Sequence, residues 1–258
     1  MSKKKQKSEL SHQRFIDCRI TIFIPTLSEH FKVIRVDFLD QGQSGKLVGK
    51  TYTQEIQVDL IQALLSHLNL ESIHVCGISY GAEVALKFAI KYPNSTKRLM
   101  LFNCGAYTSP WLSEIGKSWI FTGKTRNGEH YYKTAIPVIY SPHFYEERLD
   151  WMKKREQILI PVFSNPDFLD QMERLTLSAE SFDVRADLKK IKCPTFIISA
   201  EEDYLTPVFE QEYLAQNIED SHWIKIPQTG HASMYEKPLI FTTLLTGFFG
   251  VKDTSYLI

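Results

Sequence analysis

Short apolar runs alternate along most of this chain with longer stretches in which apolar residues recur at helical spacing. Six runs have the length and composition of buried strands. They are residues 19–24, 32–38, 73–76, 97–102, 194–200 and 223–227. Residues 53–70 and 239–249 carry the clearest helical patterns. Strands that alternate with helices predict an α/β fold, with a mostly parallel central sheet flanked by helices.

Between residues 107 and 188 this alternation stops. The segment has a helical pattern that is predicted to break at Pro137, Pro142, Pro161 and Pro166, and it is rich in aromatic residues. Because it is too long for a loop, we predict a helical cap subdomain at 107–188, above the sheet edge where ligands bind in such folds. The α/β core then comprises 19–106 and 189–258, after a poorly structured tail at 1–18. Some cap aromatics are expected to line an apolar pocket, and most to pack the cap itself.

The pattern from 73 to 92 predicts a strand, a sharp turn and a helix. Residues 77–81 are Gly-Ile-Ser-Tyr-Gly, and Gly-x-Ser-x-Gly in this setting is typical of a nucleophile elbow. The serine is held in a strained conformation, and the flanking glycines leave room for neighbouring backbone. The following helix N-terminus favours developing negative charge near the hydroxyl. Ser79 is therefore the predicted nucleophile.

A serine nucleophile needs a base, and the base needs a third group that orients it. In elbow folds an acid and then a histidine follow the serine along the chain. His231 lies just after one predicted strand, and Glu201, Glu202 and Asp203 follow another. All four fall at the sheet edge that carries Ser79, and the residues alone leave the choice of acid open.

The charge balance and the cysteine content limit the kinds of partner and the cellular compartment that the sequence predicts. Thirty basic and thirty acidic residues balance, which argues against a nucleic-acid partner. No apolar run is long enough to cross a bilayer. The four cysteines lack the spacing of a metal site and are predicted to be mostly buried free thiols. Free thiols are typical of a reducing compartment, so we predict a cytoplasmic protein. His74, inside a strand-like run, is predicted to be buried as well. No metal or cofactor is expected.

Four ordered motifs resemble the α/β-hydrolase superfamily over residues 31–249. They are Val-Asp and Gly-Gln-Ser within 36–44, the elbow at 77–81, Asp-Tyr-Leu-Thr-Pro at 203–207, and Gly-His followed by Glu-Lys-Pro at 230–238. The family commonly has an Asp four residues before a Pro. The resemblance therefore selects Asp203 as the acid and implies a triad of Ser79, Asp203 and His231. It also implies a cap like those of esterases, carbon–carbon-bond hydrolases and aminopeptidases.

The first part of the chain departs from the family pattern. Members usually have a β-hairpin and then a strand that ends in His-Gly, whose loop donates an N–H to the oxyanion. No His-Gly precedes the elbow here. Too little chain precedes residues 20–24 for the usual hairpin, so the N-terminal hairpin is expected to be truncated. The backbone N–H of Tyr80 remains as one oxyanion donor, and Thr26 is the candidate for the other. A naturally short variant, a wrong gene start and a weakly active protein all stay open.

The resemblance implies a serine hydrolase that forms an acyl-enzyme with a small or medium apolar carboxylic ester. The same triad serves thioesterases, carbon–carbon-bond hydrolases and acyltransferases, so these remain alternatives. A weakly active or non-catalytic ligand-binding protein is the alternative from a different class. The expected partner is a small acyl compound, without nucleic acid or stable membrane insertion, and the oligomeric state is not predicted.

Overall fold

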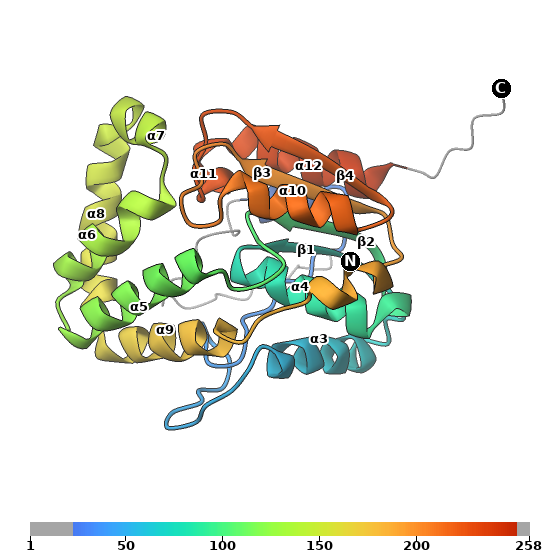
Figure 1. The fold of residues 1–258 in the computed structure, drawn as a ribbon, viewed down its shortest axis with the longest axis horizontal. Coiled ribbons are helices and arrows are strands. Elements are labelled where there is room, and N and C mark those ends of the chain that lie inside the picture. Colours follow the sequence, from blue (N-terminus) through green and yellow to red (C-terminus); the bar gives the residue numbers. More distant parts are fainter. Residues whose placement is uncertain (1–22, 252–258) are drawn as a thin grey trace, which may run out of the picture.

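The structure is a computed structural model that describes residues 23–251. Four strands form one sheet in the order β1-β2-β3-β4, and each neighbouring pair is parallel. They are β1 (Ile73–Ile78), β2 (Thr96–Phe102), β3 (Thr195–Ala200) and β4 (Ser221–Ile226). The predicted parallel sheet with flanking helices is confirmed (Figure 1).

Helices cover both faces of this sheet because side chains of the central strands are apolar on both sides. Leu99 and Leu101 of β2 join one buried cluster, whereas Met100 and Phe102 join another. The first cluster includes α3 (Glu55–His67), α4 (Tyr80–Lys91) and α10 (Val208–Asn217). The second includes α2 (Ile24–Ser28) and α12 (Pro238–Gly250). Short helices η1 (Pro93–Ser95), η2 (Arg185–Lys190) and α11 (Ser233–Glu236) complete the core.

Five helices lie between β2 and β3 and form a separate layer beside the sheet, green to yellow in Figure 1. They are α5 (Pro110–Lys124), α6 (Gly128–Ile139), α7 (Pro142–Glu147), α8 (Leu149–Phe163) and α9 (Pro166–Ala179). We call α5–α9 the helical insertion. It has its own aromatic cluster, which includes Tyr132, Tyr140 and Phe163.

Side-chain caps explain where most of these helices begin. The side chains of Ser109, Asn127, Ser141 and Asn165 each accept a hydrogen bond from a first-turn N–H. Proline begins α5, α7 and α9, where its missing N–H costs nothing. The predicted breaks at Pro137 and Pro161 are wrong, because both lie inside helices.

Two predicted strands are not observed as strands. Residues 32–38 have no regular secondary structure in the described chain, although Val33 and Phe38 pack against the two sheet clusters. A strand needs a neighbour, and no described strand pairs with this run. Directly after it, the backbone N–H and C=O of Leu39 bond to the Gln57 side chain instead, at 2.9 and 3.0 Å. Of the run 19–24 only its last two residues are described, and Ile24 begins α2. The rest of that run, the predicted tail and the hairpin lie outside the described residues.

The burial predictions for β1 are also wrong. His74 and Cys76 are exposed on β1, which is the edge strand of the described sheet. The His74 ring stacks on Phe249, with centroids 5.1 Å apart. Cys104 is buried as predicted, and Cys193 is partly buried. Among residues 23–251, no helix is long and apolar enough to span a membrane.

Candidate active site

Each strand of the sheet leads, at its carboxyl end, to one polar residue of the candidate site. Ser79 follows β1, Asn103 follows β2, Asp203 comes after β3, and His231 lies in the loop after β4. Carboxyl ends of parallel strands meet at one edge of a sheet. The structure therefore brings the predicted Ser79, Asp203 and His231 to one edge, together with Asn103, which is not among the residues predicted from the sequence.

Ser79 occupies a strained turn between β1 and α4. Its φ of 53° and ψ of −126° are unfavourable for a residue with a side chain. Its N–H donates to Phe102 O at 2.9 Å and its carbonyl accepts from Ala82 N at 2.7 Å, which fixes the turn. A Cβ on Gly77 would collide with the Ala82 backbone, so this glycine is needed. The same expectation for Gly81 is wrong, because a Cβ there would meet nothing within 4 Å.

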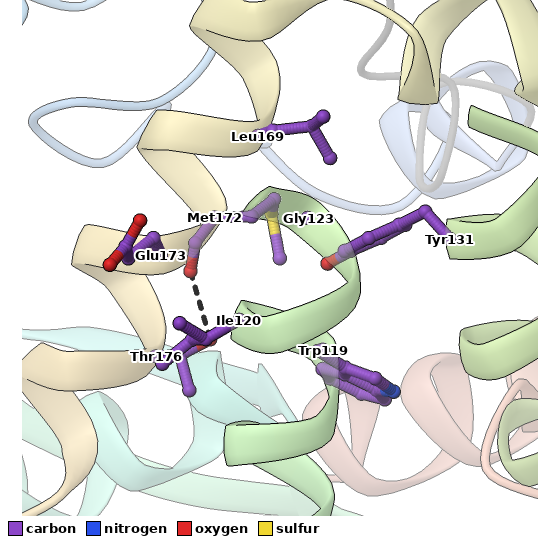
Figure 2. A pocket seen from close by; sticks show the side chains of 8 residues that line it. All are labelled: Trp119, Ile120, Gly123, Tyr131, Leu169, Met172, Glu173 and Thr176. Carbon is purple, nitrogen blue, oxygen red and sulfur yellow. Dashed lines mark hydrogen bonds between the residues drawn. The ribbon is translucent and has the colours of Figure 1, made fainter. Parts of the chain in front are cut away.

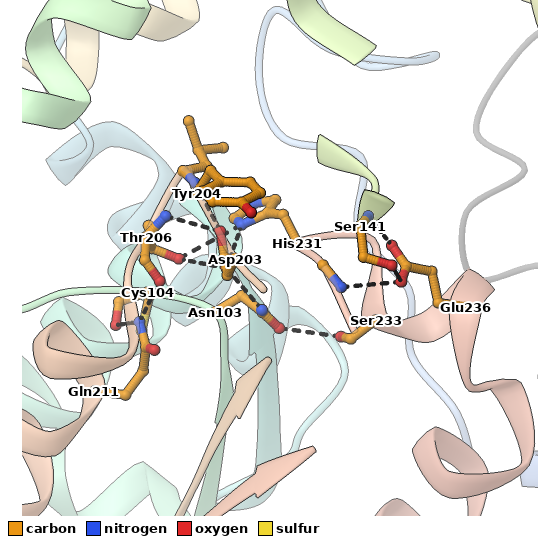
Figure 3. Close-up of polar contacts among 12 residues, drawn as sticks. Asn103, Cys104, Ser141, Asp203, Tyr204, Thr206, Gln211, His231, Ser233 and Glu236 are labelled. Carbon is orange, nitrogen blue, oxygen red and sulfur yellow. Dashed lines mark hydrogen bonds and ion pairs between the residues drawn. The ribbon is translucent and has the colours of Figure 1, made fainter. Parts of the chain in front are cut away.

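Asp203 and His231 form a buried hydrogen-bonded pair, with 2.8 Å between Asp203 Oδ2 and His231 Nδ1 (Figure 3). The carboxylate also accepts hydrogen bonds from Leu205 N (2.8 Å), Thr206 N (2.9 Å), Thr206 Oγ1 (2.8 Å) and Asn103 Nδ2 (2.8 Å). Both oxygens are therefore fully engaged, and the side chain is completely buried.

Two opposing influences act on the pKa of Asp203. Burial by itself would raise it, but the charge of His231 and the hydrogen bonds from His231, Thr206 and Asn103 lower it below the usual value. The carboxylate is thus charged at neutral pH and faces the imidazole through Nδ1, which leaves Nε2 as the free ring nitrogen for chemistry.

The two glutamates that compete with Asp203 in the sequence have other positions. Glu201 forms an ion pair with Lys225 at 2.9 Å and accepts from Gln228 N at 3.1 Å. Neither Glu201 nor Glu202 has a hydrogen bond to His231 in the part of the chain that the structure describes. Asp203 is therefore the carboxylate that contacts this histidine.

Asn103 connects the acid loop to the histidine loop. It is fully buried and has a φ of 52°, which asparagine tolerates better than most residues. Nδ2 donates to Asp203, and Oδ1 accepts from Ser233 Oγ at 3.0 Å. An asparagine directly after a strand and before Cys-Gly is a turn signal, and this was the one sequence feature that pointed to the position.

The hydroxyl of Ser79 is not hydrogen-bonded to the predicted base, His231, among the described residues. Such bonds are often long in ligand-free enzymes and tighten when substrate binds. As the first residue of α4, Tyr80 has an N–H without an acceptor inside the helix. The Tyr80 hydroxyl lies 2.9 Å from Ser178 Oγ of the helical insertion.

The position of Thr26 does not test its predicted role as an oxyanion donor. It is exposed on α2, which packs through Phe23 and Leu27 onto one face of the sheet. No described hydrogen bond joins Thr26 to the elbow. Its role as an oxyanion donor stays a prediction.

A small hollow lies elsewhere, inside the helical insertion (Figure 2). It is lined by Trp119, Ile120, Gly123, Tyr131, Leu169, Met172, Glu173 and Thr176. None of these residues belongs to the loops at the strand ends, so this hollow is separate from the Asp203–His231 pair. The described residues contain no group of three His, Cys, Asp or Glu side chains that could hold a metal ion.

Comparison with known proteins gives consistent matches over most of the chain. The model of the family described as alpha/beta hydrolase fold matches residues 15–238. The crystal structure of MGS-M2, an alpha/beta hydrolase enzyme from a Medee basin deep-sea metagenome library, is 50% identical. It superposes with a TM-score of 0.87 and covers 92% of this chain and 88% of its own.

Two curated relatives are more distant. A RutD protein of Azorhizobium caulinodans, whose name gives carbamate hydrolysis as a provisional activity, is 26% identical over 89% of this chain and 85% of its own. Lipase 1 of Psychrobacter immobilis is 26% identical over 81% of this chain and 65% of its own. These relatives are hydrolases by name, and their named substrates differ.

Proposed function

Since this chain belongs to the α/β-hydrolase fold family and is a hydrolase, we propose that it cleaves small or medium apolar carboxylic esters through a Ser79-His231-Asp203 triad. The observation that supports this most directly is the buried Asp203–His231 pair at the sheet edge where the strained Ser79 turn lies. The helical insertion is proposed to act as a cap over this edge.

The proposed reaction uses two half-reactions. Ser79 Oγ attacks the ester carbonyl carbon while His231 Nε2 takes the hydroxyl proton and Asp203 stabilises the imidazolium. The tetrahedral oxyanion forms next to the N–H of Tyr80. Collapse of this intermediate expels the alcohol, which takes the proton from His231, and leaves an acyl-enzyme. Water, deprotonated by His231, then attacks the acyl carbon and releases the acid and Ser79.

A fluorophosphonate probe tests the nucleophile directly. We expect intact-mass labelling of the wild type and none of Ser79→Ala, because the probe needs an activated serine. Asp203→Asn should lower kcat for p-nitrophenyl butyrate by up to about 10⁴-fold, because the amide favours the wrong histidine tautomer. A folded wild-type protein that neither reacts with the probe nor turns over esters would refute the proposal.

Carbamate hydrolysis is the second candidate, supported by the RutD relatives alone. The same triad would attack the carbonyl of an O-aryl carbamate, expel the phenol and leave a carbamoyl-enzyme, which water then cleaves to the amine and carbon dioxide. Paired assays with p-nitrophenyl butyrate and a phenyl carbamate separate the two candidates. A kcat/KM for the ester that exceeds the carbamate value supports the esterase proposal, and the reverse order supports the carbamate hydrolase.

A further inference from the structure

The loop that carries His231 is hydrogen-bonded to the helical insertion on both sides of the histidine. After it, Ala232 N donates to Ile139 O at 2.9 Å. Before it, Gly230 N donates to Glu236 Oε2 at 2.9 Å, and the same carboxylate binds Ser141. Residues 139–141, at the junction of α6 and α7, therefore run beside residues 230–232.

Glu236 is the centre of this contact (Figure 3). Its Oε1 accepts from Ser141 N at 2.9 Å, and its Oε2 accepts from Ser141 Oγ at 2.6 Å as well as from Gly230 N. Ser141 is fully buried, and its Oγ also accepts from Phe144 N at 3.0 Å, which caps α7. One carboxylate thus joins the start of α7 to the backbone next to His231.

The two backbones approach so closely that no side chain fits between them. A Cβ on Gly230 would collide with the backbone of Tyr140 and Ser141. Tyr140 is itself locked in the aromatic cluster, with its ring centroid 5.8 Å from those of Phe144 and Trp151. The position of the histidine loop is therefore set by the helical insertion as much as by the sheet.

We propose that Glu236 is a positioning residue for the base, which it couples to the helical insertion through Ser141 and Gly230. Three charge-assisted hydrogen bonds converge on it, and a shift of residues 139–141 would move the loop of His231. A substrate that displaces the insertion would therefore also move the base. This inference rests on the proposed serine hydrolase function.

Glu236→Gln tests the coupling, because the side-chain amide has one oxygen that accepts and one NH₂ group that donates. It therefore cannot accept from Ser141 N with one atom and from Ser141 Oγ with the other. With one end a donor, at least one of the three bonds is lost. Gly230→Ala is the second variant, because it separates the two backbones and keeps the carboxylate. Glu147→Gln is the matched control, a side chain on α7 that is 62% exposed and pairs with His143 of the same helix.

The readouts are the fluorophosphonate inactivation rate, kcat and KM for p-nitrophenyl butyrate, and the melting temperature. We expect Glu236→Gln and Gly230→Ala to lower the inactivation rate and kcat by about tenfold or more, since small misplacements of catalytic groups are costly. KM should change less than kcat, and Glu147→Gln should match the wild type. The coupling is overturned if both variants lose melting temperature but keep the wild-type inactivation rate. Absence of labelling in the wild type would instead refute the triad itself.

Discussion

Asn103 shows how one residue can contact both sides of the Asp203–His231 pair. Its amide donates to the same Asp203 oxygen that receives His231 Nδ1, and its carbonyl holds Ser233 in the histidine loop. Because an amide offers a donor and an acceptor at fixed positions, only asparagine satisfies both neighbours without adding a charge. The residue therefore favours the charged form of Asp203 while it fixes the loop.

Asn103→Asp is expected to destabilise the protein more as the pH rises. The new carboxyl would lie against Asp203, and two adjacent carboxylates cannot both ionise easily, so the folded-state pKa of the pair rises above its unfolded value. Stability is then retained at low pH and lost as the pH rises through the folded pKa. We expect a loss of about 2 kcal/mol at pH 8, or roughly 4–8 °C in melting temperature, and less at pH 5.

The exposed Asn94→Asp provides the control for Asn103→Asp. Calorimetry of both variants at pH 5 and pH 8 checks the expectation. An equal loss of melting temperature at the two pH values would show that Asn103 does not interact with the charge of Asp203.

Among the secondary-structure elements, α9 is the helix of the helical insertion that contacts the loop after residues 32–38. Arg174 donates hydrogen bonds to both carboxylate oxygens of Asp40, at 2.6 and 2.9 Å. The Asp40 side chain is completely buried. Four residues further along α9, Ser178 contacts the hydroxyl of Tyr80, the residue after Ser79. One face of α9 therefore holds the core loop and the elbow in a fixed relation.

The two ends of this ion pair are expected to respond unequally to mutation. Arg174→Met leaves the buried Asp40 carboxylate unpaired and should cost about 3–5 kcal/mol of unfolding free energy. Asp40→Gly should cost less, because the Arg174 side chain that it leaves unpaired keeps 17% exposure, whereas the Asp40 side chain has none, and Gly adopts the observed φ of 72° without strain. Arg126→Met, which breaks an exposed ion pair with Asp170, should cost under about 1 kcal/mol.

Urea unfolding of the three variants tests this order. A cost for Arg174→Met no larger than that for Arg126→Met would show that the buried pair contributes nothing special to the attachment of α9. An Asp40→Gly variant less stable than Arg174→Met would show that the carboxylate stabilises the loop chiefly through Leu47 N, which donates to it at 3.0 Å.

Across the whole molecule, the sequence pattern predicts those strands and helices whose formation depends on residues close together in the chain. The four described strands, the elbow helix and α12 agree with the predictions to within a few residues, because period and turn signals are encoded locally. The prediction of a strand at 32–38 is wrong because a strand also requires a neighbouring strand, and none pairs with this run among the described residues. The Asn103–Asp203 contact spans 100 positions of the chain, so no spacing rule identifies it. Motif order indicated Ser79, Asp203 and His231, and the structure brings them to one edge.

Three buried or largely buried glutamates make the stability of the molecule fall as the pH rises, opposite to the effect of Asp203, whose pKa is lowered. Burial raises the pKa of Glu83 to about 7, and it also raises the pKa values of Glu210 and Glu236. A carboxyl whose folded pKa is raised binds protons more tightly in the folded state, so its stabilising effect is complete below the unfolded pKa and is lost as the pH rises through the folded pKa. The protein should therefore lose stability between about pH 5 and pH 8 through these groups.

Glu83→Gln isolates the largest of these effects. Glu83 lies one turn after Ser79 on α4 and accepts a hydrogen bond from Gln54 Nε2, which a glutamine carbonyl can also accept. Because the amide stays neutral, the variant should gain stability over the wild type as the pH rises, by on the order of 3 kcal/mol at pH 9. Exposed Glu55→Gln should show no such trend. Melting curves from pH 5 to pH 9 decide the matter, and parallel curves for Glu83→Gln and the wild type would mean that Glu83 titrates as an ordinary surface carboxyl.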